Sequence, residues 1–269
     1  MSSLGKILGF LFGYMLTKHP VGALLGLWLG HKFDKGRGLN FNNLGGSQVS
    51  EASRQKNFFD TTFAVMGYMA KVNGHVSKEE IAFASAYMDK LGLSVELKKQ
   101  AQDAFRDGKT VGFPLDDYLK EFMRICGHRK DLLLMFLEIE IQVAFADGEL
   151  DASEREALHV IGKALGFATR DLDRLLDMIT AGDAFHQENT RGGNAHSSPQ
   201  KLANAYKLLG VASSASSQEI KKAYRKLMSQ HHPDKLVAKG LPPEMMEIAK
   251  QKTQDIQAAY ELVVKDKAK

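Results

Sequence analysis

In this chain of 269 residues, the tripeptide His232-Pro233-Asp234 is the strongest candidate for a functional site. An imidazole and a carboxylate flank a proline, so the segment combines a titratable ring, an anionic acceptor and a fixed bend. A basic stretch directly precedes it and holds four cations, Lys221, Lys222, Arg225 and Lys226. Positive charge beside one His–Asp pair suits the docking of an acidic partner better than catalysis or metal binding.

The basic stretch is expected to form an amphipathic helix that begins near Ser217. Ser217 is a suitable N-cap, and Gln218-Glu219 supplies an acidic first turn. Apolar residues then recur with helical spacing and predict one buried stripe, made of Ile220, Ala223, Tyr224 and Leu227. The four cations share another face of this helix, which we expect to face solvent. Pro233 should end the helix near His231, because proline fixes φ and disfavours helical geometry in the residue before it.

Two further helical patterns bracket this segment. Before it, Leu202, Ala205 and Leu209 share one face, and Gly210 provides a C-terminal stop. After it, Pro242-Pro243 opens a long stretch with a second apolar stripe, made of Ile256, Ala259, Tyr260 and Val263. The order of helix, basic helix, exposed loop and long helix predicts a small helical hairpin with one helix packed across its base.

These elements together resemble a DnaJ-type J domain over residues 201–269. The resemblance rests on Tyr206 to Val211, the basic helix, His232 to Lys235, and Gln257 to Glu261, in that order along the chain. It implies a co-chaperone that docks on a DnaK-type ATPase chaperone and stimulates its ATP hydrolysis, with no covalent chemistry of its own. By position, His232, Pro233 and Asp234 would trigger hydrolysis. The cations that hold an acidic surface of the partner would be Lys221, Lys222, Arg225 and Lys226.

Residues 53–185 predict a helical middle domain with an internal repeat. Asn73-Gly74 matches Asp147-Gly148, and Leu91-Gly92 matches Leu165-Gly166, both at an offset of 74 residues. Each unit would consist of a helix, a glycine turn, a capped second helix and a Leu-Gly stop. Two such units predict an all-α domain of about seven to nine helices. The region resembles the TerB-like domain of tellurite-resistance proteins.

Residues 1–37 predict a membrane anchor with a basic flank. Leu4 to Gly30 is almost wholly apolar and is long enough for a span of about 20 residues. A cleaved signal peptide fits less well, because only Lys6 precedes the apolar run and no small-x-small cleavage site follows it. A single pass is favoured over a re-entrant hairpin. The positive-inside bias then places the N-terminus in the periplasm and the rest in the cytoplasm, because three cations follow the span, Lys32, Lys35 and Arg37.

Two glycine triads in the anchor predict self-association of the chain into a homodimer. Glycines spaced by four residues leave a groove that lets a second membrane helix approach closely. The triads are Gly5, Gly9 and Gly13, and Gly22, Gly26 and Gly30. Lys18-His19-Pro20 lies between them. Either Pro20 kinks the helix and aligns the triads, or each triad faces a different neighbour.

Polar segments at 38–52 and 186–200 are predicted to be linkers between the three parts. The order of anchor, TerB-like domain and J domain resembles the DjlA family of DnaJ-like membrane proteins of Gram-negative bacteria, over nearly the whole chain. That resemblance implies action at the inner membrane and a link to envelope and capsule signalling. The alternative function is an envelope-stress adaptor, in which the middle domain binds a membrane sensor and stimulation of the chaperone is secondary.

Other functions find little support in the sequence. The net charge of +4 is modest, so nucleic-acid binding is not required. A single cysteine, Cys126, excludes an intramolecular disulfide framework and a cysteine-rich zinc site. The acidic cluster from Asp147 to Glu154 is too short for an EF-hand, and Asp151 with Glu154 indicates a capping box. No phosphate loop or nucleophile motif is evident, so we expect no enzyme activity, cofactor or metal.

Overall fold

The computed structural model describes residues 50–72, 74, 78–145, 148, 150–190 and 198–268. The chain divides into two compact units, Met1–Val49 and Ser50–Lys269, and the described residues belong to the second. All regular elements in the described ranges are helices, which confirms the all-α prediction. None of these helices is both long and apolar enough to cross a bilayer. The predicted anchor at 1–37, with both glycine triads, lies outside the described residues.

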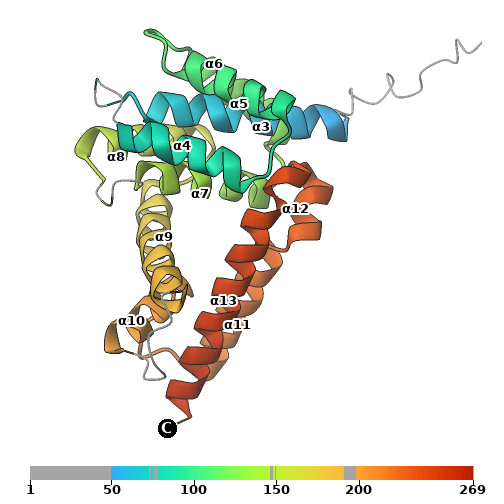
Figure 1. Ribbon diagram of the computed structural model, residues 1–269. Coiled ribbons are helices and arrows are strands. Elements are labelled where there is room, and N and C mark those ends of the chain that lie inside the picture. The colour runs from blue at the N-terminus through green and yellow to red at the C-terminus, as the bar shows by residue number, and fades with distance from the viewer. Residues whose placement is uncertain are drawn as a thin grey trace, which may run out of the picture. The chain divides into compact units, whose positions relative to one another are not determined.

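Seven helices form the middle domain within the described ranges (Figure 1). They are α3 (Glu51–Met69), α4 (Lys78–Lys90), α5 (Val95–Gly108), α6 (Leu115–Cys126), α7 (Lys130–Ala144), α8 (Ala152–Ala164) and α9 (Thr169–Thr190). Helix α3 contacts α5, α6 and α7, and fully buried phenylalanines fill the space between them. The rings of Phe58 and Phe122 lie 5.8 Å apart, and those of Phe122 and Phe136 lie 4.6 Å apart. This aromatic cluster is the centre of the domain.

The predicted internal repeat is present in the backbone. Helices α4 and α8 begin at residues 78 and 152, and α5 and α9 begin at 95 and 169, so both pairs keep the 74-residue offset. The glycine turns repeat as well, since Gly74 and Gly148 have φ of 99° and 94°. Gly92 and Gly166 have φ of 60° and 81° and end α4 and α8. Glycine suits both turns because only it adopts positive φ without steric cost.

The C-terminal domain consists of α10 (Pro199–Leu208), α11 (Ser217–Gln230), α12 (Pro233–Lys239), a 3-10 turn (Pro243–Met245) and α13 (Met246–Lys267). Helices α11 and α13 pack side by side, with Ile220 and Ile256 in the shared core (Figure 1). Two details differ from the sequence-based expectation. The N-cap of α11 is Ser216, not Ser217, because Ser216 and Glu219 form a capping box. The expected exposed loop after Pro233 is the short helix α12, which ends at the left-handed Gly240.

Helix α9 belongs to both domains. It contacts α7 and α8 of the middle domain and α10 and α13 of the C-terminal domain. In Figure 1, α10 lies beside the C-terminal end of α9. Phe185 is 1% exposed and lies in the hydrophobic core of the C-terminal domain, with Ala205, Tyr206 and Ile256. The segment 186–200, predicted to be a linker, therefore begins with the last turn of α9 and ends with the first residues of α10. Residues 191–197, between them, lie outside the described residues.

Candidate functional site

His232, Pro233 and Asp234 form the N-terminus of α12. His232 is the N-cap residue, with extended backbone angles, and Pro233 is the first helical residue, where its missing N–H costs no hydrogen bond. The side chains of His232 and Asp234 are exposed, and Pro233 is half-buried. Leu236 is 0% exposed and fixes the helix to the core beneath. The imidazole of His232 and the carboxylate of Asp234 are thus exposed on a helix that buried Leu236 anchors.

The four cations of α11 lie on the exposed face of that helix. Lys221, Lys222, Arg225 and Lys226 are all exposed, whereas Ile220 and Leu227 of the opposite face are buried. Tyr224 is half-buried and stacks on Tyr260 of α13, with ring centroids 4.1 Å apart. Among the ion pairs formed by the described residues, none involves these four cations. Their charge therefore remains available to an acidic partner.

His231, which directly precedes this motif, makes a contact that the sequence did not predict. It is 1% exposed and is the C-cap residue of α11. Its Nδ1 lies 2.9 Å from the carbonyl oxygen of Leu227, and its Nε2 lies 3.0 Å from both carboxylate oxygens of Glu138 on α7. The two residues are 93 positions apart in sequence, so no local pattern could have paired them.

Glu138 is a buried carboxylate between His231 and Lys252. It is 5% exposed, and the Nζ of Lys252 lies 3.5 Å from its Oε2. Burial by itself raises the pKa of this carboxyl, but the neighbouring His231 and Lys252 more than offset that effect and lower the pKa to about 2. The carboxylate is therefore ionised at neutral pH, in contact with both side chains from the C-terminal domain.

Three family descriptions match consecutive parts of the chain. The co-chaperone DjlA transmembrane domain matches residues 1–40, the tellurite resistance protein TerB matches 60–177, and the DnaJ domain matches 204–269. The chain is 52% identical to the co-chaperone protein DjlA of Photobacterium profundum, over 98% of both chains. It is 49% identical to that of Vibrio cholerae, over 99% of both, and 47% identical to that of Yersinia pestis, over 98% of both. No solved structure matches significantly.

The chain belongs to the DjlA co-chaperone family. The resemblance inferred from the sequence is thus confirmed for all three parts. In DjlA terms, α10–α13 are the J domain, α3–α9 contain the TerB-like domain, and the transmembrane domain precedes them. The protein is a membrane-associated co-chaperone with a J domain.

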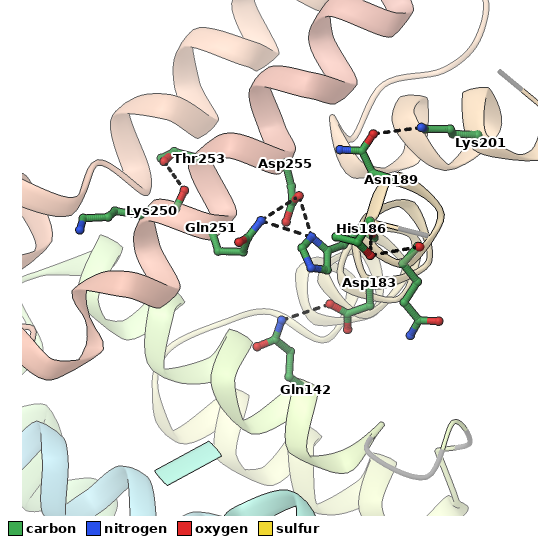
Figure 2. Close-up of polar contacts among 11 residues, drawn as sticks. Gln142, Asp183, His186, Asn189, Lys201, Lys250, Gln251, Thr253 and Asp255 are labelled. Carbon is green, nitrogen blue, oxygen red and sulfur yellow. Dashed lines mark hydrogen bonds and ion pairs between the residues drawn. The ribbon is translucent and has the colours of Figure 1, made fainter. Parts of the chain in front are cut away.

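A second group of polar contacts joins the two domains of this DjlA protein where α9 meets α13. His186 of α9 lies with its Nδ1 3.0 Å from Oδ1 of Asp255, which also accepts from Gln251 at 3.3 Å (Figure 2). Gln142 of α7 donates to Asp183 of α9 at 3.2 Å. A cavity of about 100 Å³ lies among these side chains and is also lined by Glu138 and Lys252. The boundary between the domains is therefore polar along the faces of α7, α9 and α13.

The remaining candidate residues of the middle domain do not form a second functional site within the described part of the chain. Asp151 caps α8, with its side chain 2.8 Å from the amide nitrogen of Glu154, as the capping box predicted. Asn73, His75, Ser77, Asp147 and Glu149 of the two glycine turns lie outside the described residues. The described residues contain no group of three or more acidic, histidine or cysteine side chains placed to hold a metal. Burial raises the pKa of Cys126 to about 11, so its thiol is not a reactive thiolate at neutral pH.

Proposed function

We propose that this protein docks on a DnaK-type ATPase chaperone through its J domain and stimulates ATP hydrolysis by that chaperone. The observation that carries the proposal is the exposed pair His232 and Asp234 at the start of α12, beside the exposed cationic face of α11. The J domain supplies the binding surface, and the covalent chemistry occurs on the partner. The protein itself has no enzymatic role in this proposal.

The two surfaces have separate roles in the proposed complex. Lys221, Lys222, Arg225 and Lys226 attract an acidic surface of the chaperone, which raises the rate of association and makes it dependent on salt. His232, Pro233 and Asp234 then contact the chaperone at close range. Because Pro233 fixes the local backbone and Leu236 is buried, the two polar side chains are held in place before the partner arrives.

The N-terminal segment delivers this activity to the bacterial inner membrane as a single-pass anchor. We infer that its N-terminus is periplasmic and that α3–α13 lie in the cytoplasm, since three cations follow the apolar run and only Lys6 precedes it. The glycine triads support a homodimer within the lipid. Reporter fusions after Gly30 test the orientation. Activity of a periplasm-specific reporter at that position would contradict the proposal.

The decisive experiment compares the full-length protein with its His232→Gln variant. The stimulated ATPase rate of a DnaK-type chaperone is measured with each protein in lipid nanodiscs. We expect His232→Gln to lose the stimulation, because glutamine cannot reproduce the shape and protonation of the imidazole. His128→Gln is the matched control, since His128 is an exposed histidine of the middle domain. Equal stimulation by the wild type and the His232→Gln variant would contradict the proposed function.

The alternative function, an envelope-stress adaptor whose TerB-like domain binds a membrane sensor, rests on the family resemblance alone. The exposed surface of the J domain favours the co-chaperone function over it. A pull-down with residues 53–185 from solubilised membranes tests the adaptor function. Retention of one specific membrane protein would support it, and an empty result would count against it.

A further inference from the structure

A buried charged cluster connects the TerB-like domain to the J domain directly beside the partner-binding motif. Glu138 of α7 contacts His231 and Lys252. Glu138 and His231 are buried, and the side chain of Lys252 is 15% exposed. Removing charges from water costs several kcal/mol per ion unless each charge is paired in good geometry. A cluster of this kind is stable only while the two domains stay in contact. The cluster therefore indicates that the J domain is docked on the TerB-like domain in one defined arrangement.

Both ring nitrogens of His231 face hydrogen-bond acceptors. Nδ1 faces the carbonyl oxygen of Leu227, which can only accept a hydrogen bond. Nε2 faces both oxygens of Glu138, which also only accept while the carboxylate is ionised. The ring is therefore placed between two acceptors, a backbone carbonyl on one side and the Glu138 carboxylate on the other. Hydrogen bonds to an ionised carboxylate are roughly twice as strong as neutral ones and hold the ring in one orientation.

The TerB-like domain holds α12 at both of its ends. At the N-terminal end, Glu138 binds His231, which is adjacent to His232 in sequence. At the C-terminal end, Lys239 forms an ion pair with Asp131 of α7. Gly240 approaches α3 so closely that an added Cβ would lie 2.9 Å from the Cβ of Arg54. Between these contacts, His232 and Asp234 remain exposed.

We propose that Glu138 is a positioning residue for partner binding: through His231 it fixes the direction in which His232, Pro233 and Asp234 face the chaperone. The J domain then acts while docked on the TerB-like domain. Exposure of His232, Asp234 and the α11 cations in the docked state favours this over an inhibitory contact. The inference rests on the proposed function and adds to it a residue outside the J domain.

The first test is the Glu138→Gln variant of the full-length protein in lipid nanodiscs. Glutamine keeps the shape of the side chain but removes the carboxylate charge that His231 and Lys252 contact. We expect the co-chaperone concentration that gives half-maximal stimulation of the chaperone to rise about tenfold. Removing one partner of a buried charge pair weakens the contact between the two domains by at least a factor of this size. The maximal stimulated rate should stay unchanged, because the motif itself is intact.

A matched control and a double variant separate positioning from general damage. Glu140→Gln is the same substitution two residues further along α7, also at a buried position, and it should leave the half-maximal concentration unchanged. The double variant Glu138→Gln/His231→Gln replaces the ionic contact with a neutral amide pair. Because the two residues are in contact, we expect its loss of affinity to be smaller than the sum of the losses in Glu138→Gln and His231→Gln.

Hydrogen–deuterium exchange provides a second readout that does not depend on the chaperone. We expect Glu138→Gln to speed exchange in α12 while α3 and α6 stay protected, since only the docking contact is weakened. Faster exchange without a change in half-maximal concentration would overturn the proposal, and so would no change in either. A lower half-maximal concentration would overturn it in favour of an inhibitory contact. If Glu138→Gln unfolds, His231→Gln decides by the same criteria.

Failure of this inference can be told from failure of the proposed function. The His232→Gln variant is measured in parallel by both methods. If it still stimulates the chaperone, the proposed function fails, while exchange in α12 still reports whether Glu138 holds the J domain. If His232→Gln loses stimulation and Glu138→Gln matches the wild type, only the positioning role of Glu138 is wrong.

Discussion

Two glutamates on α7, two positions apart, have opposite electrostatic environments. Glu138 faces the J domain, and its cationic partners lower its pKa to about 2. Glu140 is 0% exposed, and neither of its carboxylate oxygens has a hydrogen-bond partner in the described part of the chain. Burial raises the pKa of Glu140 well above its ordinary value of 4.5. The surroundings therefore favour the anionic form of the side chain at position 138 and disfavour it at position 140.

The raised pKa of Glu140 predicts that the stability of the fold depends on pH. A carboxyl whose pKa is higher in the folded state stabilises the fold fully below its unfolded pKa, and that contribution is lost as pH rises. We expect Glu140→Gln to remove this dependence, so that the variant gains stability over the wild type between pH 5 and pH 8, by roughly 1–3 kcal/mol. Urea unfolding of residues 50–269 at both pH values measures the difference in unfolding free energy between the variant and the wild type. An equal difference at both pH values would contradict the prediction.

At the scale of single elements, α9 contributes to the stability of both domains. Phe185→Ala should destabilise the J domain by about 3–5 kcal/mol, because it removes a buried ring from the core of α10, α11 and α13. Amide exchange should speed in α10 and α13. Phe122→Ala is the matched control, since Phe122 is equally buried in the middle domain and should instead speed exchange in α3 and α7. Unchanged exchange in α10 after Phe185→Ala would disprove the shared core.

The cationic face of α11 predicts salt-dependent association. Reversal of all four charges to glutamate should lower the association rate with the chaperone roughly tenfold or more at low salt. The difference from the wild type should shrink as salt rises, because exposed charges are screened. The control reverses Lys163 and Arg170, two exposed cations of the middle domain. Stopped-flow association at several salt concentrations measures the effect, and a salt-independent difference would argue against steering.

Local patterns predicted most elements of this fold but few of its long-range contacts. The stripe of α11 and the Leu-Gly stops at Gly92 and Gly166 follow from spacing and from glycine geometry, which depend on neighbours in sequence. Helix α12 was missed, although Pro233 at its first position and Gly240 after its last are helix signals. The pairing of His231 with Glu138 could not be predicted, because it depends on how two domains pack.

At the scale of the whole molecule, the anchor predicts dimerisation through its glycines. We expect Gly9→Ile and Gly26→Ile each to weaken self-association in the membrane, because a branched side chain prevents close approach of the helices. Energy transfer between two labelled full-length copies in lipid vesicles measures the dimer. A loss in only one variant would show that a single triad forms the contact. Unchanged transfer in both would contradict the glycine-based dimer.

The division of α9 between two cores has a consequence for synthesis on the ribosome. The turn that carries Phe185 emerges before α10–α13, so its apolar face lacks its full set of packing partners until the 78 residues from His186 to Val263 have been made. At bacterial elongation rates of 5–20 residues per second, that interval is roughly 4–16 s. During it, the nascent co-chaperone exposes an apolar helix end of the kind that chaperones bind. Its own maturation should therefore depend on the timing of translation, and synonymous codons after Thr190 that slow elongation should lower the soluble yield of residues 50–269.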